Sequence, residues 1–420
     1  MSAPTTADQD PAPEVPRRLE MAVYGAATFS NSLGYMMMVV LPLWALTLGV
    51  SPLMVGIILG ARHVLVLLYS IHGGAMMDRL DVRRVMIAFA GFGVLLPLLF
   101  PVTPWIWAII ILQMIGGYCS ATGWMGAQAI IGQVMRGSAV HTGRMAFVVR
   151  IGALIGPPLA GAAWDFGGPW AAFGTLSAWG LGMLLCCFAL PPVQQEGDTG
   201  PRPRPRVADL MPRLSDYLIA FRMLVVPLVA VVMAVSVLRI AGFSIQSSFY
   251  AVYLEGRGYN GTAIGVLLAA YSLFGGGLSL AVGPLTRRFA PLWLLIFVIG
   301  GSAVAIALTP ALGSYWLLLL AAAVNGGCYG LSQPLVISIT SRVVGRGEQG
   351  KAVGLRTTAN RLAATFLPVI MGAVVQGVGL EASFYITGGA VVALLALVAL
   401  GARLVTSPAD RMPGSGLPKG

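Results

Sequence analysis

The chain has few charged residues. Asp, Glu, Lys and Arg make up 10% of its 420 residues, against about 25% in an ordinary soluble protein. Apolar residues account for 57% of the chain, and 54 glycines come in addition. So little polar surface cannot cover a globule in water. The composition excludes a soluble enzyme, a disordered chain and a secreted disulfide scaffold, and it predicts an all-α membrane protein.

Cysteine and histidine are scarce as well, with four and three residues. Cys119, Cys186, Cys187 and Cys328 all lie in apolar runs, and none has the spacing of a zinc site or a redox pair. We therefore expect no metal and no cofactor. The polar segment 1–20 has no apolar core, so we expect no cleaved signal peptide.

Long apolar runs dominate the rest of the chain. A spanning helix needs roughly 20 apolar residues, and the breaks between runs predict twelve spans, near 22–48, 52–73, 84–102, 105–134, 145–166, 169–190, 222–254, 262–285, 290–309, 314–341, 355–378 and 382–405. A proline- and arginine-rich stretch divides them six and six. We expect a tail (1–20), an N-terminal six-helix half (21–190), a linker (191–221), a C-terminal six-helix half (222–405) and a second tail (406–420).

The basic residues predict the orientation. With the N-terminus in the cytoplasm, 21 of the 26 Lys and Arg residues fall in cytoplasmic segments and only Arg257 falls in an outer loop. Cytoplasmic loops of membrane proteins carry this excess. We expect a multi-pass protein of the bacterial inner membrane with both termini in the cytoplasm. No basic patch is interleaved with aromatic residues, so the charge does not indicate a nucleic-acid partner.

The two halves are related by an internal repeat. A shift of 209 residues pairs glycines and a loop arginine of the second span with those of the eighth, and a shift of 211 pairs the fifth span with the eleventh. The pairs include Gly49 with Gly258, Gly56 with Gly265, Arg79 with Arg288, Arg150 with Arg361, and Pro157 with Pro368. Two pseudo-symmetric halves in tandem predict a central cavity between bodies that rock against each other.

The loop after the second span carries a recognisable motif. Gly74, Asp78, Arg79 and Arg83 stand at the spacing of a glycine-, aspartate- and arginine-containing loop of the major facilitator superfamily, which the chain therefore resembles. Asp81 stands where that motif has its second glycine. The resemblance implies a twelve-helix transporter and a gating role for these four residues.

Two further spans refine the resemblance. Gly152, Gly156, Pro157 and Gly161 in the fifth span resemble the glycine–proline motif of antiporters in this superfamily, which implies a gating helix and favours efflux. The fourth span departs from the proton-coupled exporters, because Gln113 replaces their arginine and Gly116 their glutamine. That departure puts the usual proton machinery in doubt.

Ionisable residues at membrane depth are costly and need a reason. Arg62, His63 and Arg239 lie deep in predicted spans, Arg150 and Arg361 lie nearer the cytoplasm, and no Asp or Glu reaches the same depth. An electropositive cavity and an anionic substrate would explain this pattern. His63 is the first candidate for carrying a proton, and Asp165 at the outer mouth is the second.

We predict a substrate site made of the deep cations and four amides, with Arg239 at its centre and with Arg150 and Arg361 as gates; its members are Arg239, Arg62, His63, Asn31, Gln113, Gln246 and Asn325. Alternatives remain open for each. Arg62 can snorkel or cap a broken helix, His63 can be a packing residue, and the amides can pair between helices.

We predict a secondary active transporter that exports a small organic anion by antiport. The counter-substrate would be protons or another anion, and we expect a monomer in the bilayer. A polyspecific drug and proton antiporter for neutral or cationic compounds, and an uptake carrier for organic anions, are the alternatives. The chain has no metalloprotease, nucleophile-elbow or P-loop motif and no paired carboxylates, which argues against an enzyme. The linker is too short for the output domain of a sensor.

Overall fold

The computed structural model describes residues 15–69, 77, 81–135, 139–190, 227–343 and 349–405. Within these ranges every regular element is a helix. In chain order they are α1 (Arg17–Thr47), α2 (Pro52–Ala61), α4 (Val82–Val102), α5 (Ile106–Gln133), α6 (Ala139–Ala189), α8 (Pro227–Ser248), α9 (Tyr250–Gly256), α10 (Gly261–Ser279), α11 (Val282–Arg288), α12 (Pro291–Ala307), the short 3-10 turn η3 (Thr309–Ala311), α13 (Tyr315–Val343), α14 (Gln349–Val378) and α15 (Leu380–Val405).

Each of the twelve predicted spans has a helical counterpart. Ten helices in the described ranges are long and apolar enough to cross a membrane, and the bent pair α11 and α12 makes an eleventh. α6 covers the predicted fifth and sixth spans together, because Gly168 (φ 62°, ψ −156°) interrupts its helical backbone. Counting α6 as two spans brings the number to twelve.

The internal repeat is visible in the backbone. Four glycines in the described ranges have positive φ: Gly49 (63°), Gly258 (84°), Gly168 (62°) and Gly379 (86°). Gly49 and Gly258 differ by 209 residues, and Gly168 and Gly379 by 211, the same two shifts that align the halves in the sequence. Because an L side chain rarely adopts this conformation, the same turns in both halves require glycine.

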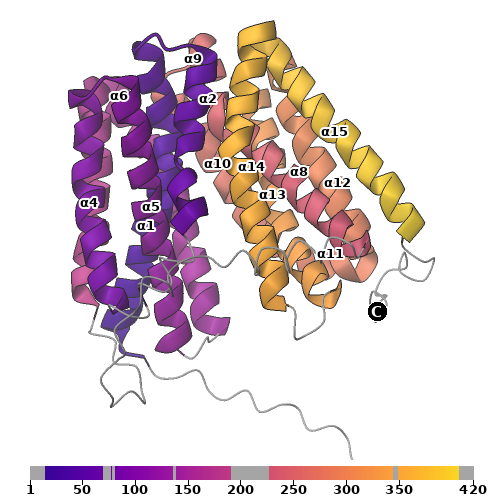
Figure 1. Ribbon diagram of the computed structural model, residues 1–420, viewed down its shortest axis with the longest axis horizontal. Helices are drawn as coiled ribbons and strands as arrows, with labels where there is room; N and C mark the ends of the chain where they lie inside the picture. Colours follow the sequence, from indigo (N-terminus) through magenta and orange to yellow (C-terminus); the bar gives the residue numbers. More distant parts are fainter. Residues whose placement is uncertain are drawn as a thin grey trace, which may run out of the picture.

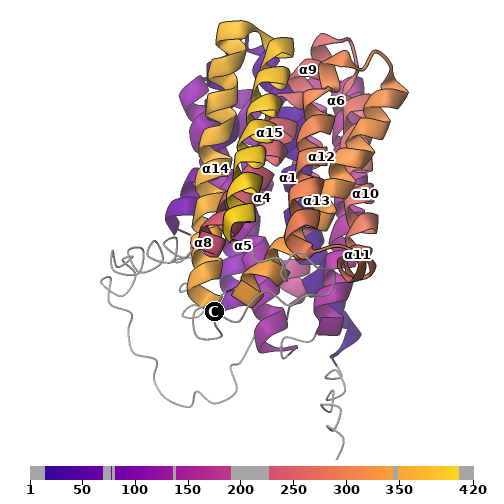
Figure 2. The ribbon, with the colours of Figure 1, turned by 90° about the vertical axis from the view of Figure 1, so that its right-hand side faces the viewer.

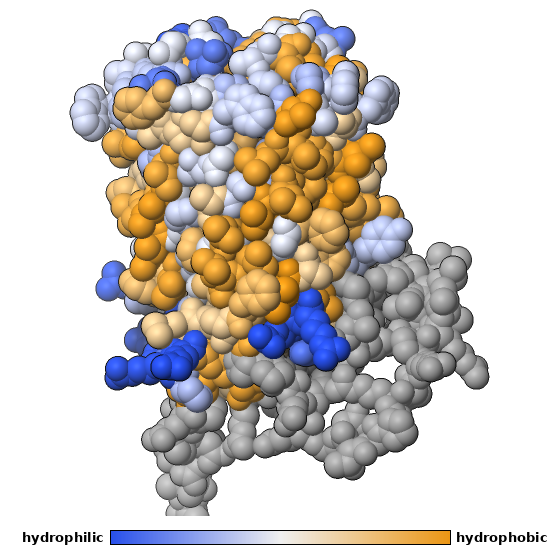
Figure 3. Space-filling model, turned by 90° about the vertical axis from the view of Figure 1, so that its left-hand side faces the viewer, coloured by the Kyte–Doolittle hydropathy of each residue, from blue (hydrophilic) through white to orange (hydrophobic). Residues whose placement is uncertain are grey.

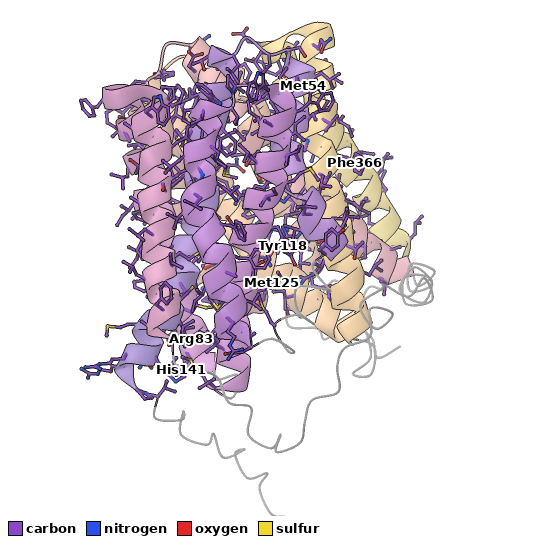
Figure 4. The ribbon with its side chains drawn as sticks, turned by 60° about the vertical axis from the view of Figure 1, so that its left-hand side comes forward. Met54, Arg83, Tyr118, Met125, His141 and Phe366 are labelled. Carbon is purple, nitrogen blue, oxygen red and sulfur yellow. The ribbon has the colours of Figure 1, made fainter. Side chains whose placement is uncertain are left out.

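The helices form two groups (Figures 1 and 2). The N-terminal group, α1, α2, α4, α5 and α6, lies together on the left of Figure 1. The C-terminal group comprises α8–α15, of which α8 and α12–α15 lie on the right. α1 begins and α15 ends at the lower side, which we call the basic end because it carries Arg17, Arg83 and Arg403. We call the opposite side, with Gly49 and Asp165, the far end. Figure 4 places the labelled Arg83 and His141 at the basic end and Met54 toward the far end.

The surface of this bundle suits a bilayer. Figure 3 shows a broad apolar belt bounded by hydrophilic residues at both ends. Large apolar side chains such as Phe297, Trp316 and Leu404 are exposed by 76%, 76% and 89%. A soluble protein does not leave so much contiguous apolar surface in water, so the belt is the lipid-facing surface.

The two groups meet at the far end along two seams that the repeat relates. In the first seam α2 packs on α14, where a Cβ on Gly56 would overlap the carbonyl oxygen of Pro368. In the second seam α10 packs on α6, where a Cβ on Gly265 would overlap the carbonyl oxygen of Pro157. A shift of 209 residues maps Gly56 onto Gly265, and a shift of 211 residues maps Pro157 onto Pro368, so the repeat relates one contact to the other. Glycine lets the backbones approach this closely.

The backbone conformation of Asp81 explains why glycine is favoured at this position of the loop motif. Its φ is 78°, in a sparsely populated region that costs a residue other than glycine about 1–3 kcal/mol. Its carboxylate compensates by capping α4, since Oδ1 accepts a hydrogen bond from the Arg83 N–H at 3.2 Å. Asp81 thus combines a strained backbone with a helix cap.

Two substitutions at this position separate the two effects. Asp81→Ala keeps the unfavourable φ and loses the cap, so we expect it to destabilise the protein by about 1 kcal/mol. Asp81→Gly loses the cap but removes the strain, so we expect a smaller change. Thermal unfolding of the purified variants in detergent measures the difference, and an Asp81→Gly variant less stable than Asp81→Ala would contradict this account.

Candidate functional site

A cavity of about 230 Å³ lies between the two helix groups. α1, α2 and α5 line it from one group, and α8 and α14 line it from the other. Its volume lies just below the range of about 300–1,000 Å³ that is usual for small-molecule pockets. A site shared by both groups in this way changes shape whenever the groups move.

Arg62 lines the cavity from the middle of the second span. α2 ends at Ala61, a tighter hydrogen-bonded turn follows at Arg62 and His63, and helix resumes at residue 64. Nη1 of Arg62 lies 3.5 Å from the Gly34 carbonyl oxygen, at the limit of hydrogen bonding. A Cβ on Gly34 would lie 2.8 Å from Nη2 of Arg62, and a Cβ on Gly117 would overlap its carbonyl oxygen. Glycines of α1 and α5 therefore make the space that Arg62 fills.

The charge of the cavity is positive. Arg62, His63 and Arg361 of α14 all line it. Among the described residues that line the cavity there is no Asp or Glu. Asn31 and Gln113 line it too and bring amide groups. Five of the residues that the sequence singles out thus line one cavity, and Arg361, predicted as a gate, is among them.

Arg239 lies elsewhere. It is 6% exposed, it belongs to a separate small hollow within the C-terminal group, and its guanidinium carbon stands 4.7 Å from the ring centre of Tyr329. The Tyr329 ring in turn stacks on Phe243, with centroids 5.1 Å apart, and Phe243 lines the cavity. These rings link Arg239 to the cavity wall.

Gln246 and Asn325 form bonds within the C-terminal group. The Asn325 side chain donates to Oε1 of Gln246 at 3.0 Å, and Ser302 donates to Oδ1 of Asn325 at 2.5 Å. Both amides are almost fully buried, and neither lines the central cavity. For these two residues the structure matches the alternative of interhelical pairing between α8, α12 and α13.

The glycine–proline motif of α6 serves two packing surfaces. Gly152 and Gly156 lie against α1, where added Cβ atoms would stand 2.6 Å from Thr28 Cγ2 and 2.9 Å from Met36 Cγ. Pro157 and Gly161 face α10 in the far-end seam. This motif therefore links the cavity helix α1 to the contact between the two groups.

Two of the other predicted gate residues, Arg150 and Arg83, lie within the described part of the chain. The stem of Arg150 lies against α10, since its Cδ would be 3.5 Å from a Cβ on Gly276. Arg83 donates from Nη2 to the Phe188 carbonyl oxygen at 3.1 Å. Gly74, Asp78 and Arg79 lie outside the described residues.

A carboxylate joins the groups at the far end. Oδ1 of Asp165 accepts from the Gly261 N–H at 2.7 Å, and Oδ2 accepts from the Thr262 N–H at 2.8 Å and from its hydroxyl at 2.5 Å. Asp165 on α6 thus holds the first turn of α10 across the seam. Its negative charge also faces the positive end of the α10 dipole.

Some residues of the cavity were not predicted as ligands. Ser244, Ser247 and Ser248 of α8 line it together, and their i, i+3, i+4 spacing places them on one helix face. This polar stripe in an apolar span is a signal that the sequence contains. Tyr35, Trp124 and Phe243 add an aromatic wall. In the described part of the chain no group of three or more His, Cys, Asp or Glu residues could hold a metal ion.

Known proteins resemble this chain in sequence and in fold. The tetracycline resistance protein, class C, of Escherichia coli is 25% identical over 312 residues, which cover 72% of this chain and 74% of that protein. A variant of the nucleoside transporter NupG superposes with a TM-score of 0.77 at 13% identity, covering 91% of this chain and 99% of that one. A bacterial homologue of the lysosomal transporter Spinster, in an inward-facing and unoccupied conformation, gives 0.69 at 14% identity, covering 93% and 97%.

The family assignment rests on the sequence. The model of the Major Facilitator Superfamily matches residues 24–260 and 232–416, so it covers both helix groups. The solved structures agree with it at the level of the fold. The chain is a membrane transporter rather than an enzyme, and it belongs to the Major Facilitator Superfamily.

Proposed function

We propose that this transporter exports a small organic anion across the bacterial inner membrane by alternating access. The observation that carries the proposal is the central cavity, where Arg62, His63 and Arg361 converge and the described lining holds no carboxylate. An anion would supply the missing charge and bind both guanidinium groups through charge-assisted hydrogen bonds. A cation would meet unfavourable charge at the same place.

The orientation that we propose places the basic end in the cytoplasm. Among the described residues, arginines gather at that end of the helices, namely Arg17, Arg18, Arg83, Arg84, Arg144, Arg287, Arg288 and Arg403. The far end holds Arg257, which pairs with Glu381 at 3.5 Å. An excess of positive charge marks the cytoplasmic side. In this orientation the two far-end seams seal the cavity from outside.

Two observations support export rather than uptake. The motif of Gly152, Gly156, Pro157 and Gly161 resembles that of antiporters, and in this structure it contacts both α1 and the opposite group. The relative from Escherichia coli is a resistance protein, and resistance is consistent with removal of a compound from the cell.

A drug exporter for neutral or cationic compounds is the second candidate. The aromatic wall of Tyr35, Trp124 and Phe243 favours it, because rings bind apolar and cationic bodies. Within this candidate the arginines would be structural. The net charge of the cavity makes us prefer the anion.

Ligand binding separates the two candidates. We expect benzoate, succinate or inorganic phosphate, but not tetraphenylphosphonium, to raise the unfolding temperature of the purified protein. An anion at 100 times its dissociation constant stabilises by about 2.7 kcal/mol. We expect Arg361→Gln to lose this shift and Arg239→Gln to keep most of it, because Arg239 does not line the cavity. A shift with the cation alone would overturn the anionic site and support the drug exporter.

A further inference from the structure

A second, smaller hollow of about 40 Å³ lies within the N-terminal group. We call it the side hollow. α1, α4, α5 and α6 enclose it, and its walls are mainly apolar. Met37, Arg62, Gln113 and Ser120 line both the side hollow and the central cavity. The two spaces therefore adjoin, and the side hollow is an apolar extension of the electropositive cavity.

Two glycines leave the side hollow open. Gly93 of α4 and Gly116 of α5 both line it, and nothing lies within 4 Å of the position that a Cβ would take on either residue. The next residue along α5 differs, because a Cβ on Gly117 would overlap the backbone carbonyl oxygen of Arg62. Close packing thus requires glycine at Gly117 but not at Gly93 or Gly116. Glycine inside a helix is less favourable than alanine, and at these two positions it leaves unfilled space.

The internal repeat shows that the same helix arrangement can be filled. A shift of 209 residues places the first residues of α2, α4 and α5 on those of α10, α12 and α13. The same shift maps Gly93 onto Ser302 and Gly116 onto Asn325. In the C-terminal group these two residues are buried and hydrogen-bond to each other. One half therefore holds a bonded pair of side chains where the other half has open space, so the side hollow results from the choice of residues and not from the helix packing.

The size of the side hollow suits a small apolar group. A buried water needs about 10–15 Å³, and an apolar cavity of about 150 Å³ stays dry and binds benzene. At about 40 Å³ the side hollow is too small for an aromatic ring and has room for one or two methyl groups. Leu96, Phe100 and Leu176 in its wall offer apolar surface to such a group but no hydrogen bond to water.

We propose that the side hollow binds a short branched alkyl group of the transported anion, while the acidic group of that anion stays in the central cavity near Arg62. This inference rests on the proposed anionic site and narrows its ligands to compact acids with one apolar end. A dicarboxylate of similar length would place its second charge among apolar side chains, where an unpaired charge is costly to bury. A shorter acid would leave the side hollow empty and gain nothing from its walls.

The affinities of two acids test the subsite. Dissociation constants of propanoate and isovalerate are measured for the purified full-length protein in detergent, from the dependence of its unfolding temperature on ligand concentration. Isovalerate is branched and has two more carbon atoms, each of which contributes about fourfold in affinity when it is buried. We therefore expect isovalerate to bind about 15-fold more tightly than propanoate. Equal affinities would overturn the subsite and leave the anionic site intact. Failure of both acids, and also of benzoate, succinate and phosphate, to bind would overturn the anionic site and the subsite together.

Alanine variants locate the alkyl group. Gly93→Ala and Gly116→Ala each add one methyl group to open space, so neither should lower the unfolding temperature of the empty protein. Each should weaken the binding of isovalerate by about fourfold and leave that of propanoate unchanged, and the double variant should bind both acids equally. Gly91→Ala on α4 also enters open space but lines neither the side hollow nor the cavity, so it should behave as wild type. A full preference for isovalerate in the double variant, or an equal loss of that preference in Gly91→Ala, would overturn the subsite.

Discussion

Replacing Gly56 with alanine should slow the transport cycle by roughly 5- to 150-fold, the effect of about 1–3 kcal/mol of overpacking. The new Cβ would overlap the Pro368 carbonyl oxygen and would stand 2.9 Å from its carbon and 3.1 Å from Cα of Val369. All three are backbone atoms, so no side chain can move aside. The α2–α14 seam must widen, and the carrier should shift toward the state in which the far end is open. Gly265→Ala should act alike in the other seam, where Pro157 takes the place of Pro368.

Spin-label distances report this shift directly. Ser51 and Gln376 are exposed at the far end on either side of the seam, and labels there should move apart in Gly56→Ala, in a background without the native cysteines. Gly91→Ala is the matched control, because nothing lies within 4 Å of the position of its Cβ. An unchanged distance in Gly56→Ala, or an equal change in Gly91→Ala, would refute the role of the seam.

Replacing Asp165 with alanine should also shift the carrier toward the state in which the far end is open, in this case because hydrogen bonds across the seam are lost. Its carboxylate accepts three hydrogen bonds from Gly261 and Thr262 of the opposite group. A hydrogen bond to a charged group contributes about 1.5–3 kcal/mol, and these bonds hold only while the far end is closed. Their loss should therefore raise the population open at the far end by roughly 10-fold or more. Asp165→Asn keeps one acceptor oxygen and should lie between wild type and Asp165→Ala.

Asn260 provides the control for this prediction. Its side chain caps the same helix, with Oδ1 accepting from the Ala263 N–H at 2.9 Å, but it belongs to the same group as α10. Asn260→Ala should lower stability without opening the seam. Labels at the exposed Phe166 and Glu255 measure the separation of the two groups. If Asn260→Ala and Asp165→Ala separate the labels equally, Asp165 acts only as a helix cap.

The spans and the family could be predicted from the sequence because their causes are local. A run of about 20 apolar residues spans a bilayer as a helix, since backbone groups in lipid must bond within their own segment. The internal repeat could be recognised in the sequence for a similar reason. Gly49 and Gly258 occupy turns with positive φ that few other residues tolerate, so the same residue recurs at the same place in both halves.

The identity of the cavity residues depended on the tertiary structure. Arg62 and Arg239 both lie deep in apolar spans, and the sequence favoured Arg239. In the structure Arg62 lines the cavity, whereas Arg239 does not line it and lies over the Tyr329 ring. A polar stripe such as that of Ser244, Ser247 and Ser248 can mark the cavity face of a span. Where a helix is apolar all round, however, a single deep arginine does not reveal which face borders the cavity.

The sequence and the tertiary structure thus determine different properties of this protein. The sequence by itself determined the helices, their number, the repeat and the superfamily, because hydrophobic length and turn glycines act within a segment. The tertiary structure alone decided that Arg62 and Arg361 share one cavity, that Gln246 and Asn325 pair with each other, and that Asp165 reaches across to α10. These contacts join residues far apart in the chain, and their existence depends on how each helix is rotated about its axis, which packing between helices sets.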